Sequence, residues 1–156
     1  MTYEQHRGRR IAMTPDEVDA FLAEQRTCRI ATVGVDGPHA TPLWFVWHGG
    51  ALWLYSLVRS QRWTDLTRDP RVAALVDTGH DYGELRGVEL RGRVTVVGET
   101  PRTGEPLAEL DEPERLFARK YFDVDQPAHD GRHGWLRLDP DRIVSWDFRK
   151  IAAAGK

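Results

Sequence analysis

The sequence lacks a second cysteine, a long apolar run and a strong charge of either sign. With Cys28 alone, no disulfide can form within the chain, and a reducing cytoplasm is the expected compartment. No apolar stretch is long enough to cross a membrane, and residues 1–10 carry no apolar segment of the signal-peptide kind. A net charge of −2 argues against broad nucleic-acid binding. We therefore expect neither a nucleic-acid nor a membrane partner.

Common catalytic motifs are also absent. The sequence has no nucleophile elbow, no P-loop and no Gly-x-Gly-x-x-Gly run, so hydrolase, NTPase and Rossmann interpretations lose support. His129 and His133 have i, i+4 spacing, but Gly131 between them indicates a polar loop rather than a helix. No metal site is expected.

What the chain does contain fits one folded domain over residues 1–156. It is 40% hydrophobic and 29% charged, which is typical of a globular protein with a real core. Its six tryptophans suggest core packing, a large interface or an aromatic ligand. Residues 1–13 are interpreted as an N-terminal tail, either mobile or strapped onto a partner subunit. Residues 99–131 are interpreted as a helical insertion, with a helix over 114–121.

Alternating apolar residues separated by turn residues predict an antiparallel meander. Thr14, Pro15 and Glu17 form a helix start, and this helix is expected to end near Arg26. Six or seven strands with flanking helices predict a mainly β fold, a small antiparallel barrel. The expected strands are 28–35, 39–47, 51–57, 71–78, 85–97, 133–138 and 143–148, the last two joined by a turn at 139–141.

The strand at 39–47 is apolar on both faces. Such a strand is expected to be covered on both sides, so its outer face needs a cover, for example a second subunit. Pro42 cannot donate to a ladder and predicts a bulge or an edge there, where backbone groups are free to contact a ligand.

The stretch 55–72 carries the sharpest functional signal. It indicates a strand end, a helix start near Ser60 and a stop at Asp69-Pro70, with Ser56, Arg59 and Arg62 close to the helix start. Free N–H groups, the helix dipole, hydroxyls and guanidinium groups all favour phosphate. The alternative is that Ser60 only caps the helix and the arginines are solvated. Trp63 is expected to pack beneath the helix.

Several ordered motifs resemble the pyridoxamine 5′-phosphate oxidase-like split-barrel superfamily, and within it the branch of actinobacterial flavin/deazaflavin-dependent oxidoreductases. The similarity covers roughly residues 14–98 and the final strand. The runs that carry it are 30–45, 52–56 and 60–72, together with 85–88 and 145–150. The resemblance implies an FMN-binding type of split barrel and a homodimer with cofactor sites at the subunit interface.

The resemblance also implies which residues bind the cofactor. The strand at 39–44 would line the ring system, Ser56 and residues 60–62 would hold the phosphate, and Trp146 would come from the facing subunit. The alternative for Trp146 is a place in a packed terminal strand. Arg62 stands where lysine is usual and keeps the charge, whereas Asp65 replaces the usual asparagine. The implied cofactor-binding residues are His39, Ala40, Thr41, Pro42, Leu43, Ser56, Ser60, Gln61, Arg62 and Trp146.

The cofactor implied by the resemblance is the deazaflavin F420, with FMN as the alternative. Ser60-Gln61-Arg62 replaces the oxidase-type Ser-Arg-Lys, and the surplus of arginine between 59 and 71 suits a polyanionic tail. The expected activity is hydride transfer from reduced F420 to a small unsaturated or electrophilic substrate. The alternatives are an FMN-binding oxidoreductase and a non-catalytic flavin-, deazaflavin- or tetrapyrrole-binding protein. No catalytic residue stands out, although Tyr82 and His39 are candidates for a proton donor.

Overall fold

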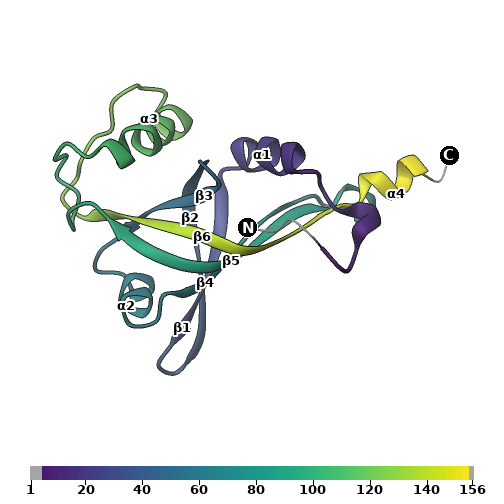
Figure 1. The fold of residues 1–156 in the computed structure, drawn as a ribbon, viewed down its shortest axis with the longest axis horizontal. Helices are drawn as coiled ribbons and strands as arrows, with labels where there is room; N and C mark the ends of the chain where they lie inside the picture. Colours follow the sequence, from purple (N-terminus) through teal and green to yellow (C-terminus); the bar gives the residue numbers. More distant parts are fainter. Residues whose placement is uncertain (1–4, 155–156) are drawn as a thin grey trace.

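The computed structural model of the protein describes residues 5–154, in which six strands form a closed antiparallel barrel (Figure 1). Around the barrel the strands follow the order β1-β2-β3-β6-β5-β4. This confirms the predicted barrel with flanking helices. The strands are β1 (Thr27–Gly34), β2 (Gly37–His48), β3 (Ala51–Leu57), β4 (Arg71–Thr78), β5 (Arg86–Val97) and β6 (His133–Asp147). The α-helices are α1 (Pro15–Glu24), α2 (Gln61–Arg68), α3 (Ala108–Phe122) and α4 (Arg149–Ala154), with short 3-10 helices at Arg9–Ile11 and Tyr82–Glu84.

Local sequence explains the helix starts. Thr14 and Glu17 form the predicted capping box at the start of α1, with Pro15 in the first turn. Ser60 caps α2 by accepting a hydrogen bond from the Trp63 backbone N–H at 3.1 Å. None of the helices described between residues 5 and 154 is both long and apolar enough to span a membrane.

The apolar side chains divide between two cores. Inward-facing residues such as Leu52 and Leu54 of β3 fill the barrel together with α1 and α2. Outward-facing residues of the same strand, such as Trp53, pack with Leu110 and Phe117 beneath α3. Because side chains alternate along a strand, β3 serves as the wall between the two cores.

The predicted turn at residues 139–141 is wrong. One strand, β6, runs from His133 to Asp147 and pairs with β5 along its length. The register shifts between Arg91 and Gly92, which places Pro140 opposite Gly92. A Cβ on Gly92 would lie 2.1 Å from the Asp139 carbonyl oxygen, so only glycine allows the close approach. The sequence feature that resembles a turn is therefore a bulge, a position where a strand accommodates proline.

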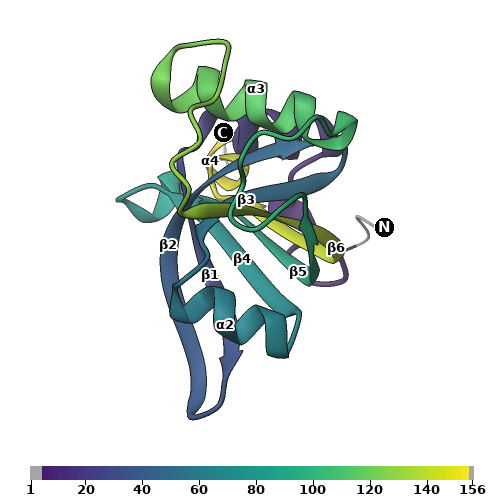
Figure 2. The same ribbon diagram turned by 90° about the vertical axis from the view of Figure 1, so that its left-hand side faces the viewer.

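The insertion at residues 99–131 contains a longer helix than predicted. Instead of beginning after Pro113, α3 begins at Ala108 and passes through Pro113 to Phe122. It ends at Asp123, whose φ of 55° is left-handed. Figures 1 and 2 show α3 lying over the outer side of β2, β3 and β6, on the opposite side of the barrel from α2.

The barrel wall is incomplete along β2. Residues 37–44 pair with β1, whereas the pairing of β2 with β3 involves only residues 45–48. Pro42 therefore lies where β2 is paired on one side, in agreement with the predicted edge. Figure 2 shows the β1–β2 hairpin extending below the barrel beside α2. This opening is the part of the fold in which the polar residues of the site converge.

The described part of the N-terminal segment lies against its own β6. The Gln5 side chain accepts a hydrogen bond from the Ser145 backbone N–H at 2.9 Å. The Met13 backbone N–H donates to the Ser145 hydroxyl at 2.9 Å, and Met13 is buried. Residues 1–4 of the predicted tail lie outside the described residues.

Candidate functional site

The candidate site centres on Arg62, a buried arginine at the opening of the barrel. Only 7% of Arg62 is exposed. Its Nε donates to the Ser56 hydroxyl of β3 at 3.1 Å, and its Nη1 donates to the Thr41 hydroxyl of β2 at 2.6 Å. Both partners are neutral, and within residues 5–154 no carboxylate forms an ion pair with Arg62. Burial lowers the pKa of the guanidinium, because the charged form loses its contact with water. An anion placed beside the guanidinium would offset this cost.

Helix α2 holds Arg62 in this position. Its start is fixed by Ser60, whose hydroxyl donates to the Leu57 carbonyl at 2.7 Å. Trp63 packs into the barrel core as predicted, and its ring lies against Gly134 of β6, where a Cβ would come within 2.8 Å of it. Because Trp63 is held in the core, Arg62, which precedes it in α2, points into the gap between β2 and β3.

Asp65 is fully buried and faces β1. Its carboxylate accepts hydrogen bonds from the Gln61 amide at 2.8 Å and the Thr32 hydroxyl at 2.9 Å. These two bonds hold the pKa of Asp65 below its usual value, so the side chain is ionised. His39 Nδ1 lies 3.9 Å from the carboxylate. Gln61 and Thr32 therefore stabilise a buried carboxylate at position 65. Among the residues described, Asp65 makes no ion pair with Arg62.

The predicted cofactor residues fall into three groups within one chain. Thr41, Ser56 and Arg62 are in direct contact, and Ser60 and Gln61 lie at the start of the same helix. His39 and Leu43 share the Thr41 side of β2, whereas Ala40 and Pro42 are exposed on its outer side. Trp146 is not near these residues in one chain: it packs on Gly87 of β5 at the end of β6 that leads into α4.

A basic groove adjoins the start of α2. It has a volume of about 400 Å³ and contains two exposed arginines, Arg59 and Arg132. The Val58 backbone N–H donates to the Arg132 carbonyl at 3.0 Å, which ties the segment before β6 to the end of β3. Sequence reasoning found Arg59 but missed Arg132, because only the pairing of β3 with β6 brings the two together.

A second, largely apolar cavity of about 580 Å³ lies between α3 and the barrel wall. The rings of Trp44, Tyr55, Phe117, Phe122 and Trp135 line it. The Tyr55 hydroxyl is buried and has no hydrogen-bond partner in the described part of the chain. The apolar outer half of β2 is therefore covered in part by α3: Trp44 stacks on Tyr121 with ring centroids 4.4 Å apart and remains 43% exposed.

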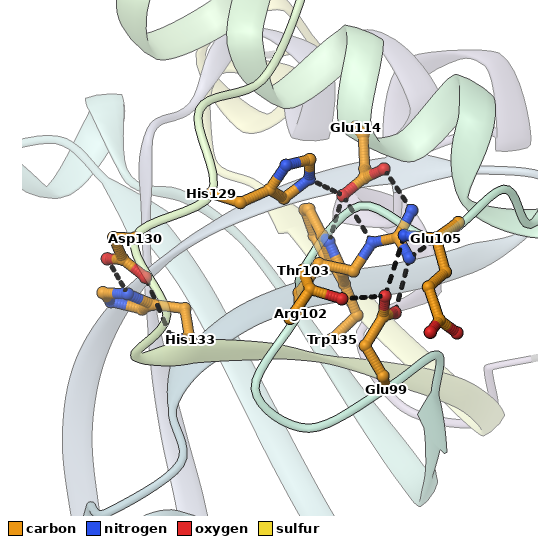
Figure 3. A network of polar contacts seen from close by, with 9 residues as sticks. All are labelled: Glu99, Arg102, Thr103, Glu105, Glu114, His129, Asp130, His133 and Trp135. Atoms are coloured by element: carbon orange, nitrogen blue, oxygen red, sulfur yellow. Dashed lines mark hydrogen bonds and ion pairs between the residues drawn. The ribbon is translucent and has the colours of Figure 1, made fainter.

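One wall of this cavity is fixed by an ion-pair network in the insertion (Figure 3). Arg102 donates two hydrogen bonds to Glu114, at 3.0 and 2.9 Å, and also binds Glu99. His129 and the Trp135 indole N–H contact the same Glu114 carboxylate, each at 3.1 Å. Burial opposes ionisation of Glu114, but these hydrogen bonds outweigh it and hold its pKa below the usual value.

The two histidines of the 129–133 segment have separate partners. His129 contacts Glu114, and His133 Nδ1 contacts the Asp130 carboxylate at 2.5 Å (Figure 3). No cluster of three or more histidine, cysteine, aspartate or glutamate side chains suited to a metal ion was found in the described residues.

Structural comparison finds similar proteins over most of the chain. A conserved hypothetical protein from Mycobacterium tuberculosis is 29% identical with a TM-score of 0.78, covering 97% of this chain and 93% of its own. An F420 reductase is 22% identical (TM-score 0.58; 80% and 94% covered). An FAD-binding protein from Mycobacterium smegmatis is 18% identical (TM-score 0.62; 87% and 95% covered). The last two similarities show a shared fold.

Among curated proteins, none matches the sequence. The family model of pyridoxamine 5′-phosphate oxidase, in contrast, matches residues 14–147, from the cap of α1 to the end of β6. The chain belongs to the pyridoxamine 5′-phosphate oxidase family and has a split-barrel fold.

Proposed function

We propose that the protein is an oxidoreductase that uses the deazaflavin F420 to reduce a small unsaturated or electrophilic substrate, working as a homodimer in the cytoplasm. The observation that carries this proposal is Arg62, a buried guanidinium held by two neutral hydroxyls and engaged in no ion pair within residues 5–154. A phosphate beside it would supply the missing negative charge and further hydrogen-bond acceptors.

The surrounding groups fit a phosphate. Ser56 and Thr41 orient the guanidinium, and Ser60 and Gln61 place the first turn of α2 next to it. The backbone N–H groups of a first helical turn have no partner within the helix and favour anions. The hydroxyl of Ser60 is engaged in the helix cap, so its contribution to the phosphate would come through the backbone.

The hydride chemistry belongs to the cofactor, which in its reduced form supplies the hydride when bound. The protein would position the ring along β2, at His39, Ala40, Pro42 and Leu43. The unpaired side of β2 at residues 37–44 supports this placement, because it leaves backbone groups free. In the proposed homodimer, Trp146 would reach the site of the opposite subunit.

Two features favour F420 over FMN. The Ser-Gln-Arg sequence at residues 60–62 resembles the deazaflavin-binding branch, and the basic groove with Arg59 and Arg132 adjoins the phosphate site. A polyanionic tail would make use of both arginines, whereas FMN ends at its single phosphate.

The test is a fluorescence titration of the purified protein with F420 and with FMN. We expect tight binding of F420 and weaker binding of FMN; tight FMN binding with none for F420 would reverse the choice. Arg62→Ala should weaken the cofactor by about 1.5–3 kcal/mol, the value of a hydrogen bond to a charged group. Arg62→Lys keeps the charge and serves as the matched control. An affinity unchanged in Arg62→Ala would place the phosphate elsewhere.

Turnover and assembly are tested separately. Reduced F420 is mixed with a panel of enones, quinones and tetrapyrroles, and its oxidation is followed by absorbance. Oxidation by none of them would favour the alternative, a cofactor-binding protein without turnover. Sedimentation of the protein as a monomer would contradict the proposed homodimer.

A further inference from the structure

The aromatic cavity beneath α3 has the shape and lining of a site for a flat molecule. Its volume of about 580 Å³ lies within the range of small-molecule pockets. The Tyr55 and Phe117 rings have centroids 5.3 Å apart, and Phe117 meets Trp135 edge-on at 88°. Tyr55 also stacks on His133, with centroids 4.8 Å apart. Rings held in fixed orientations by one another favour a planar aromatic guest.

One polar group in this cavity has no partner. The Tyr55 hydroxyl is buried and makes no hydrogen bond within residues 5–154. Burial, with a further contribution from the Asp130 and Glu114 carboxylates, raises the pKa of Tyr55 to about 12. The hydroxyl is therefore protonated at neutral pH and available as a donor, and a ligand oxygen placed against it would satisfy it.

The charges around the cavity disfavour an anion. Its lining residues include no lysine or arginine, and the two carboxylates among them already have partners. Glu114 is bound by Arg102 and His129, and Asp130 by His133. An added negative charge would face these carboxylates in an apolar setting, and the one lining side chain that can carry a positive charge, His133, is engaged with Asp130.

We propose that this cavity binds a flat, uncharged aromatic molecule with a carbonyl oxygen, which accepts a hydrogen bond from the Tyr55 hydroxyl. Tyr55 and Ser56 are consecutive on β3, so Ser56 turns inward to Arg62 while Tyr55 turns outward into the cavity. Leu43 of β2 also lines the cavity. The cavity thus adjoins the proposed cofactor site across β2 and β3. Its use as the substrate pocket rests on the proposed function; the binding itself does not.

The experiment compares matched ligands on the intact protein by isothermal titration calorimetry. The probes are 2-acetylnaphthalene, 2-ethylnaphthalene, which has the same shape without the oxygen, and 2-naphthoate, which is anionic. The variants are Tyr55→Phe and, as a control, Tyr82→Phe, whose tyrosine is 72% exposed. Tyr55→Phe should weaken 2-acetylnaphthalene about five- to tenfold, the loss of one neutral hydrogen bond, and leave 2-ethylnaphthalene unchanged. Tyr82→Phe should change neither, and 2-naphthoate should bind more weakly than 2-acetylnaphthalene.

Three results would overturn this inference: no binding of the two neutral probes to the wild-type protein, equal effects of Tyr55→Phe on both of them, or displacement of 2-acetylnaphthalene by saturating F420. Titrating F420 into the same variants separates the two proposals. If F420 does not bind while 2-acetylnaphthalene shows the Tyr55 effect, the proposed function fails and the aromatic site stands. If F420 binds and the neutral probes do not, the reverse holds.

Discussion

Replacing Arg102 by methionine should destabilise the protein more than any change to its surface ion pairs. Arg102 is 3% exposed and Glu114 is 6% exposed, so the substitution leaves a buried carboxylate without its cation. Methionine retains most of the aliphatic volume, so the loss reports the charge rather than a cavity.

The size of the loss follows from the partners that remain. Removing one member of a buried ion pair costs about 3–5 kcal/mol. After the substitution Glu114 still contacts His129 and the Trp135 indole, and Glu99 still accepts from the Thr103 hydroxyl and the Glu105 backbone N–H. These contacts compensate part of the lost interaction, and we expect the lower end of the range, about 3 kcal/mol.

Urea unfolding followed by tryptophan fluorescence gives the measurement, with Trp44 and Trp135 both close to α3. The control is Arg115→Met, which removes an exposed pair with Glu112 on the same helix and should cost less than about 1 kcal/mol. A loss in Arg102→Met no larger than that of the control would refute the reasoning.

The same network predicts an acid response. The folded-state pKa of Glu114 lies below its ordinary value of about 4.3, so its stabilisation is present above that pH. It is lost as the pH falls through the lower, folded-state pKa. Glu114→Gln should therefore flatten the fall of unfolding free energy with acidification, and an unchanged pH profile would contradict this.

Three further predictions concern stability. Burial lowers the pKa of Lys120 to about 8 in the folded protein. Between about pH 8 and 10.4 the unfolded state therefore binds more protons than the folded state, and the free energy of unfolding should rise with pH. Lys120→Met should remove this rise. Ser60→Ala should lower the free energy of unfolding in urea by about 1 kcal/mol, because α2 loses its cap. An unchanged free energy of unfolding would show that the Ser60 cap does not stabilise the protein. Gly134→Ala should lower the melting temperature by overpacking against Trp63, whereas Gly83→Ala, which meets open space, should not.

The barrel could be predicted because its signals are local. Alternation and turn residues place β3 and β4 at their observed bounds, Ala51–Leu57 and Arg71–Thr78. Pro140 misled because its effect depends on a residue far along the chain: opposite Gly92 it lies in a bulge within a continuous strand. Pro113 misled for a different reason: proline usually starts or breaks a helix, whereas α3 passes through Pro113 in its N-terminal half.

Part of the candidate site was predictable: residues 56–62 carry several of its side chains, and the resemblance adds Thr41 of β2. Residues 56–62 contain Ser56 and Arg62, and the structure brings them into contact. The basic residue Arg132 and the cavity at Tyr55 could not be foreseen, because both arise when the end of β3 meets the start of β6. An alternating strand pattern predicts that Tyr55 faces outward, but not what covers it.

The way α3 is attached also bears on how the protein changes over evolution. The ion-pair network joins Arg102, Glu99, Glu114 and His129 within the insertion, and the barrel adds the Trp135 indole and the carbonyl oxygen of His133 to it. The helix itself is bound to the barrel: Tyr121 and Lys120 donate to the Phe45 carbonyl of β2, and Arg137 of β6 pairs with Glu109. The insertion is therefore held partly by its own residues and partly by the barrel, and substitutions in the loops on either side of α3 can reshape the cavity wall while the six strands keep their residues. Selection could in this way retune what the cavity admits while leaving Arg62 and its two hydroxyl partners untouched.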